Sequence, residues 1–248
     1  MKRLYFILII LLIIPVNSWS LTADQIVKIS EDKLNARTQV SLMKMTIKTK
    51  RWTRVMVMKQ WYHTKSKKSL AEIIAPKKDA GNRFLLMNKS MRHYIPKLGR
   101  VIKISPSMMM QSWMGSDFSN DDVIKESNPN DDFTKRLLGT ETVDGYNCYV
   151  IEMKPKAHAA VEWGKIKYYV RKDVLLPVKK EFYNQRNKLR KVMTFKAFKR
   201  MHGRLIPTIY RMQNLRKKNR YTELQIVKIR FNVRLPYRVF TIQNLKRR

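Results

Sequence analysis

The residue types that could support catalysis or metal binding are sparse and scattered along this chain. The four histidines, His63, His93, His158 and His202, lie far apart and show no paired ligand spacing, so a zinc site is not expected. The single cysteine, Cys148, falls within a strand-like stretch, where a small buried apolar residue is its default role. No Gly-x-Ser-x-Gly motif occurs. We therefore expect a protein that is not an enzyme and that uses no cofactor and no metal.

Acidic residues gather in one short stretch, MGSDFSNDDVIKESNPNDD, at residues 114–132. The chain has a formal net charge of +35 and 18 acidic residues, yet six of them lie here: Asp117, Asp121, Asp122, Glu126, Asp131 and Asp132. Their spacing does not match a calcium-binding loop with its distant glutamate. Ser119-x-x-Asp122 has the form of a capping box, which would place Asp121 and Asp122 in the first turn of a short helix.

Capping gives no reason for the acidic residues that follow, and two further roles stay open for Asp117, Asp121 and Asp122. These carboxylates could pair with the protein's own basic strands and hold a lid closed. They could instead face a basic surface on a partner protein. Helix capping alone is the third interpretation.

Methionine is abundant, with 15 residues in the chain. The segment around the acidic stretch has no period of two, yet it holds three consecutive methionines and a tryptophan. Because methionine is flexible and polarizable, it is favoured on surfaces that accept varied apolar partners. We expect an acyl-chain cavity with a movable cover, although ordinary core packing is the alternative for most strand methionines. The candidate residues are Met43, Met45, Ile47, Met56, Met58, Met108, Met109, Met110, Trp113, Met114 and Phe118.

The N-terminus has the features of a secretory signal peptide. Lys2 and Arg3 precede an apolar run from Leu4 to Val16, and Ser18-Trp19-Ser20 supplies small residues at the −3 and −1 positions of a cut after Ser20. The run is shorter than the ~20 residues of a membrane-spanning helix, although an uncleaved anchor is the alternative. We expect export to the periplasm as one domain over residues 21–248, without acylation, since Leu21 and Thr22 follow the apolar segment.

The positive charge limits the class of partner. Loss of Lys2 and Arg3 with the signal peptide lowers the net charge only from +35 to +33. For an exported protein the available polyanions are lipid headgroups and acidic proteins rather than nucleic acid. We therefore expect no nucleic acid partner and count an anionic membrane surface as a candidate partner.

Most of the chain alternates with a period of two. About ten or eleven such stretches are joined by short turns, for example near Lys50-Arg51, Lys172-Asp173 and His202-Gly203, which predicts an antiparallel meander. Residues 21–37 instead predict a helix, with Thr22 and Gln25 at capping-box spacing. The expected fold is mainly β: one curved half-barrel sheet whose apolar inner face is covered by the N-terminal helix and a helical lid segment.

The run MRHYIPKLGRVIKIS at 91–105, followed by SWMGSDFSNDDV at 112–123, resembles the signature of the outer-membrane lipoprotein-sorting protein family, relatives of the LolA and LolB carriers. Residues 144–156, 168–192 and 240–245 are similar to later parts of that family, so the resemblance spans nearly all of residues 21–248. It implies a half-barrel of antiparallel strands closed by helices around a lipid-accepting cavity.

The expected function is that of a soluble, monomeric periplasmic carrier. It would bind the acyl chains of a lipoprotein or lipid, receive them from an inner-membrane transporter and pass them to an outer-membrane acceptor. The alternative is a periplasmic regulator or scaffold that senses lipid or mislocalised lipoprotein with the same fold, without transfer.

Overall fold

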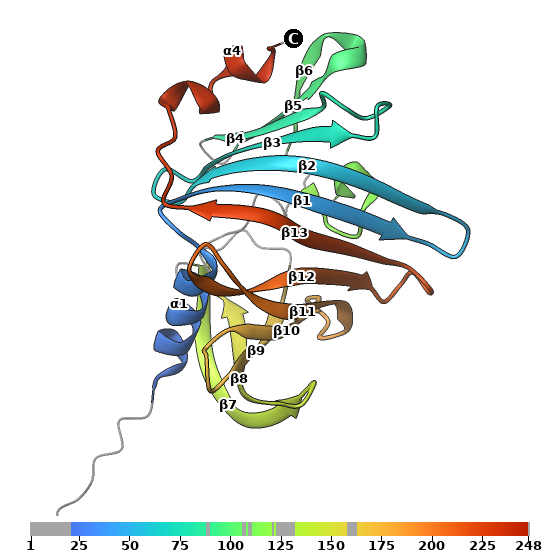
Figure 1. Cartoon of the computed structure of the whole chain (residues 1–248). Coiled ribbons are helices and arrows are strands. Elements are labelled where there is room, and N and C mark those ends of the chain that lie inside the picture. Colours follow the sequence, from blue (N-terminus) through green and yellow to red (C-terminus); the bar gives the residue numbers. More distant parts are fainter. Residues whose placement is uncertain are drawn as a thin grey trace, which may run out of the picture.

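The computed structural model describes residues 21–87, 90–105, 108, 111–120, 122, 132–157 and 163–247 (Figure 1). Helix α1, Ala23–Leu34, begins at the predicted capping box: the Gln25 N–H donates to Thr22 Oγ1 and the Thr22 N–H donates to Gln25 Oε1. None of the helices in the described residues has the length and apolar character needed to cross a membrane.

The rest is one antiparallel sheet of 13 strands within the described residues. Their bounds are β1 Thr38–Lys48, β2 Thr53–His63, β3 Lys68–Ala75, β4 Arg83–Met87, β5 Ser90–Ile95, β6 Arg100–Lys103, β7 Phe133–Val143, β8 Tyr146–Pro155, β9 Lys165–Arg171, β10 Pro177–Tyr183, β11 Leu189–Met201, β12 Arg204–Asn214 and β13 Tyr221–Phe231. The mainly β prediction is confirmed, whereas the expected number of ten or eleven strands is too low.

Three strands, β3, β6 and β7, were not predicted from the sequence. Each lacks the alternation of apolar and polar residues for a physical reason. Strand β3 is buried on both faces over Ser69–Ala71. Strand β6 has only four residues, and most of the β7 side chains are exposed. A strand that is buried on both faces or exposed on both faces does not alternate in hydrophobicity.

The strand order explains how the sheet is assembled: β6-β5-β4-β3-β2-β1-β13-β12-β11-β10-β9-β8-β7. The chain starts in the middle, runs by hairpins to the β6 edge, crosses to the β7 edge, and returns by hairpins until β13 pairs with β1. The sheet is strongly curved and keeps two separate edges (Figure 1). Residues 104–132, between β6 and β7, therefore connect its two edges.

The two faces of the sheet are each covered, but by different segments. The inner face carries the main core, which includes Ile26 and Val27 of α1 and alternate residues of β1–β5 and β8–β10. Helix α1 is also bound to the sheet by Glu31, which accepts hydrogen bonds from Tyr168 Oη at 3.0 Å and Lys180 Nζ at 3.0 Å.

The outer face of β2–β5 carries a second apolar cluster of Leu70, Leu85 and Tyr94. It packs against the C-terminal segment, residues 235–247, which forms the 3₁₀ turn η4, Tyr237–Phe240, and the short helix α4, Ile242–Leu245. For this half of the sheet the outer face is therefore apolar and is covered by the end of the chain, a cover that the expected fold did not include.

Candidate functional site

Methionine and isoleucine side chains from β1 and β2 form an apolar floor on the inner face. Met45 lies opposite Met56 in the register of the two strands, and Met43 lies opposite Met58. Met45, Ile47 and Met56 have no exposed surface, and Met58 has almost none. Because successive residues of a strand point to opposite faces, these alternate positions all reach the inner core. Met43 is partly buried against the same cluster.

Residues 111–120 form a compact loop that lies over this floor, here called the inner cover. The Trp113 N–H donates to the Phe118 carbonyl at 2.8 Å, and the Asn120 N–H donates to the Gln111 carbonyl at 2.9 Å. The turn η3, Trp113–Gly115, contains Met114 in the left-handed region. Trp113 and Phe118 are buried in the main core.

Asp117 fixes the inner cover to the start of β13. Its side chain is fully buried, and Oδ1 lies 2.8 Å from Arg220 Nε while Oδ2 accepts a hydrogen bond from Thr222 Oγ1 at 2.8 Å. The Asp117 N–H donates to the same Thr222 oxygen. Removing one partner of such a buried pair leaves the other charge uncompensated, which is strongly unfavourable.

Asp122 forms a second attachment, to β11. Its Oδ2 lies 2.7 Å from Lys191 Nζ, and both side chains are only 9% exposed. The same oxygen accepts the Ser119 N–H, and the Asp122 N–H donates to Ser119 Oγ. The predicted capping box between Ser119 and Asp122 is therefore present.

Three further side chains fix the inner cover and the residues before it through backbone carbonyls. Arg54 Nη1 donates to the Met114 carbonyl at 3.2 Å, and Arg220 Nη2 donates to the Gly115 carbonyl. Asn120 Nδ2 donates to the Met108 carbonyl at 2.9 Å. The cover is thus bound at its perimeter by polar groups, while its centre is apolar.

The centre of the inner cover packs on β4 and β5. The Trp113 ring lies edge-on to Phe84 at 5.2 Å, and Phe84 is stacked on His93 at 4.1 Å. Burial lowers the pKa of His93 to about 4, and its Nε2 lies 2.8 Å from Asn82 Oδ1. The Trp113 indole nitrogen is buried and has no hydrogen-bond partner among the described residues.

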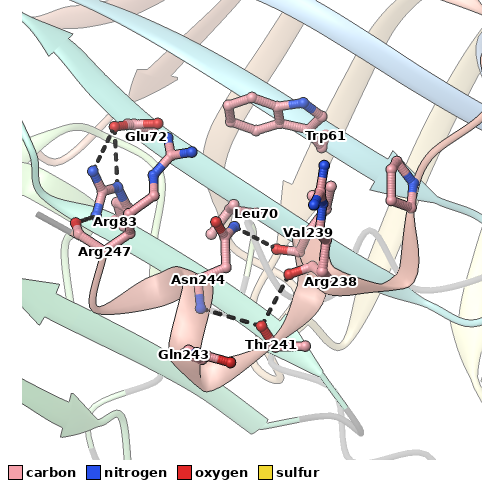
Figure 2. A pocket seen from close by; sticks show the side chains of 11 residues that line it. Trp61, Leu70, Glu72, Arg83, Arg238, Val239, Thr241, Gln243, Asn244 and Arg247 are labelled. Atoms are coloured by element: carbon pink, nitrogen blue, oxygen red, sulfur yellow. Dashed lines mark hydrogen bonds and ion pairs between the residues drawn. The ribbon is translucent and has the colours of Figure 1, made fainter.

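The outer face contains a pocket that the sequence did not reveal (Figure 2). It has a volume of about 660 Å³ and lies between β2–β4 and the C-terminal segment. Trp61 and Leu70 contribute apolar surface. Arg83 donates through Nε and Nη2 to Glu72 and through Nη1 to the Arg247 carbonyl, so it also attaches the C-terminal segment.

Comparison with known proteins places the chain in a family. A family model described as uncharacterized protein matches residues 65–247. The chain belongs to that family. A search of curated proteins gave no match.

Solved structures share the fold over nearly the whole chain. A DUF1329 family protein from Desulfovibrio piger superposes with a TM-score of 0.83 at 24% identity, covering 90% of this chain and 97% of that protein. A putative outer membrane lipoprotein-sorting protein domain from Vibrio parahaemolyticus gives 0.75 at 22%, covering 89% and 98%. A LolA superfamily protein from Nitrosomonas europaea gives 0.76 at 20%, covering 91% and 100%. The predicted resemblance to lipoprotein-sorting proteins is confirmed for the fold.

Most of the predicted site residues lie in the main core or pack against it. Six of them, Met45, Ile47, Met56, Met58, Trp113 and Phe118, share the main core, and Met43, Met108 and Met114 pack against it. Met109, Met110 and Asp121 lie outside the described residues. Acyl-chain binding by this group stays a prediction.

Sequence reasoning missed Phe84, Met91 and Ile73, which belong to the same core. Phe84 lies in the run Phe-Leu-Leu, where every residue is apolar and the inward-facing one cannot be chosen from the pattern. No group of metal-ligating side chains was found among the described residues.

Proposed function

We propose that the protein is a periplasmic carrier that binds the acyl chains of a lipid or lipoprotein on the inner face, beneath the inner cover. One observation carries the proposal: the apolar methionine floor is closed by a separate loop whose attachments are polar and lie at its perimeter. Such a loop can leave the floor as a unit when its polar attachments are exchanged for water.

The chemistry of the floor supports this. Methionine side chains adapt to partners of different shape, and each buried methylene contributes ~0.8 kcal/mol, so a sixteen-carbon chain gains roughly 12 kcal/mol on leaving water. That gain would act against the cost of displacing the inner cover and of breaking its two acidic attachments. The fold shared with a lipoprotein-sorting domain and a LolA superfamily protein supports the same class of ligand.

The attachments by Asp117 and Asp122 favour a latch within the chain over a docking surface for a partner. Arg220, Thr222 and Lys191 already satisfy these carboxylates. Transfer would then require a donor membrane protein that loads the carrier and an acceptor with stronger affinity for the acyl chains.

A fluorescent fatty acid tests binding directly. We expect saturable binding by the detergent-free protein, with faster uptake by Asp122→Asn because the attachment to Lys191 is weakened. Asp132→Asn is the matched control. Asp132 lies in the same acidic stretch, and its carboxylate forms no ion pair among the described residues. Trp113→Phe should weaken binding while preserving most of the apolar packing.

Two results would contradict the proposal. The first is no saturable binding of the probe by folded protein. The second is a set of variants that lose thermal stability while their probe affinity and uptake rate stay unchanged, which would make the methionine floor an ordinary core and the inner cover part of it.

Export is a separate part of the proposal and rests on the N-terminal sequence, because residues 1–20 lie outside the described residues. Sequencing the N-terminus of protein from the periplasmic fraction should give Leu21. Full-length chain recovered from washed inner membranes would show an anchor instead.

A further inference from the structure

Four neighbouring turns lie along one end of the sheet, where the β10–β11 turn also falls. Since neighbouring antiparallel strands reverse direction, the turns β1–β2, β3–β4, β5–β6 and β12–β13 all fall at the same end (Figure 1). The first three contribute to one surface pocket of about 660 Å³, lined by Trp52, Val55, Pro76 and Lys97 among others. Lys48 pairs with Tyr221, which places the β12–β13 turn beside the β1–β2 turn. Residues 48–52, 76–82, 96–100 and 215–220 are called the turn rim.

The turn rim is strongly cationic. Asp79 is its single acidic residue, and that carboxylate already lies 2.8 Å from Arg54. None of its exposed lysines and arginines forms an ion pair within the described part of the chain. These residues are Lys48, Lys50, Arg51, Lys77, Lys78, Lys97, Arg100, Arg216, Lys217 and Lys218.

The opposite end of the sheet is different, which shows that the overall charge alone does not produce this pattern. Its turns at 64–67, 144–145, 172–176 and 202–203 contain fewer cations and include Asp144 and Asp173. Both acids have partners: Asp144 lies 3.7 Å from Lys196, and Asp173 lies 2.6 Å from Arg171.

Large apolar side chains project among the cations of the turn rim and beside it. Leu98 is 61% exposed, Trp52 is 47% exposed and Leu215 is 42% exposed. Tryptophan is enriched at the level of lipid headgroups, where its ring is partly apolar and partly hydrated. Clustered lysines and arginines are attracted to anionic lipid headgroups. A soluble acidic protein would match the charge but gives no reason for three exposed apolar side chains at the turn tips.

We propose that the turn rim docks the protein on a bilayer surface that contains anionic lipids, with Trp52, Leu98 and Leu215 at the headgroup level and the surrounding cations against lipid phosphates. This surface is separate from the inner-face site, and docking does not depend on acyl-chain binding. The inner cover is bound to Arg54 and Arg220, which lie at or beside the turn rim, so docking would bring the candidate site close to the membrane.

Vesicle co-sedimentation tests the proposal with the mature protein. We expect binding to vesicles of equal phosphatidylcholine and phosphatidylglycerol, weak binding to phosphatidylcholine alone, and reduced binding at raised salt. Lys50→Ser combined with Arg51→Ser should weaken binding about tenfold, because each cation near the surface contributes appreciably. The charge-matched control is Lys65→Ser combined with Lys199→Ser, two exposed residues near the opposite end, and it should bind nearly as wild type.

Tryptophan emission distinguishes a membrane from other polyanions. The difference spectrum between wild type and Trp52→Phe should shift to the blue on adding the anionic vesicles. Equal loss of binding in the two double variants would overturn the proposal, as would absent binding to anionic vesicles. Equal binding of soluble polyglutamate without a Trp52 shift would overturn it in favour of an acidic protein partner.

Discussion

The inner and outer faces of strands β2–β5 are both covered, and the two covers are built differently. The inner cover, residues 111–120, is fixed by a fully buried aspartate and by a second ion pair between side chains that are 9% exposed. The outer cover, residues 235–247, is attached through Arg83 to backbone carbonyls and leaves an open pocket beside Trp61. The inner cover closes over apolar side chains, whereas the outer one leaves part of its apolar surface accessible.

This difference shows what each cover contributes. A loop held by buried charges has few intermediate positions, because partial opening exposes a charge without fully hydrating it. Such a loop is suited to two states, closed and open. A segment held by carbonyl hydrogen bonds and side-chain packing can shift gradually, so we expect the outer cover to stabilise the sheet without acting as a switch.

The largest expected effect comes from truncating the tryptophan on each face. Trp113→Ala should destabilise the protein by about 3–5 kcal/mol, since the ring is buried against Phe84. Trp61→Ala should cost only about 1–2 kcal/mol, because Trp61 is partly buried beside an open pocket. Urea denaturation of both variants measures the difference, and equal losses would show that the two covers are packed alike.

The second effect concerns pH and is confined to the inner face. His93 is neutral in the folded protein because burial lowers its pKa to about 4, from 6.5. The unfolded chain therefore binds an extra proton between those values, and stability should fall as the pH decreases from 6.5 towards 4. After allowance for the partial exposure of the ring, we expect a loss of about 1–2 kcal/mol.

His93→Gln provides the control for that titration. Glutamine can keep a hydrogen bond to Asn82 but does not titrate, so its stability should change less between pH 6.5 and 4 than that of the wild type. Identical pH profiles for the two proteins would mean that other groups cause the loss.

The sequence was informative about local pairing and the local cap. Short turns and alternation located most strands, and Ser119-x-x-Asp122 predicted a capping box that the structure contains. Contacts between residues far apart in the sequence could not be predicted. Asp117 and its partner Arg220 are 103 positions apart, and turn rules relate only neighbouring strands. The sequence therefore left open whether Asp117 and Asp122 pair within the chain or with a partner protein, and it did not identify Arg220 and Lys191 as their partners.

The outer cover could not be predicted from the sequence for a related reason. Leu70 and Leu85 lie in apolar stretches that are buried on both faces, and such stretches do not reveal which face needs a second cover. The C-terminal sequence FTIQNL, residues 240–245, contributes to the family resemblance but does not indicate which surface it covers. Its packing on Leu70, Leu85 and Tyr94 became clear from the structure.

The smallest expected effect tests whether the outer cover opens independently of the inner one. Thr241 caps α4, since its Oγ1 accepts the Asn244 N–H at 3.1 Å, and it also donates to the Arg238 carbonyl at 2.9 Å (Figure 2). Thr241→Ala should cost about 1 kcal/mol, and Thr241→Ser, which keeps the hydroxyl, should cost much less. Hydrogen exchange should then increase in residues 237–247 of the Ala variant, because a weakened cap frees the segment locally. Exchange in residues 111–120 should stay unchanged. A parallel increase there would show that the two covers open together, and the contrast between a two-state inner loop and a gradually shifting outer segment would have to be abandoned.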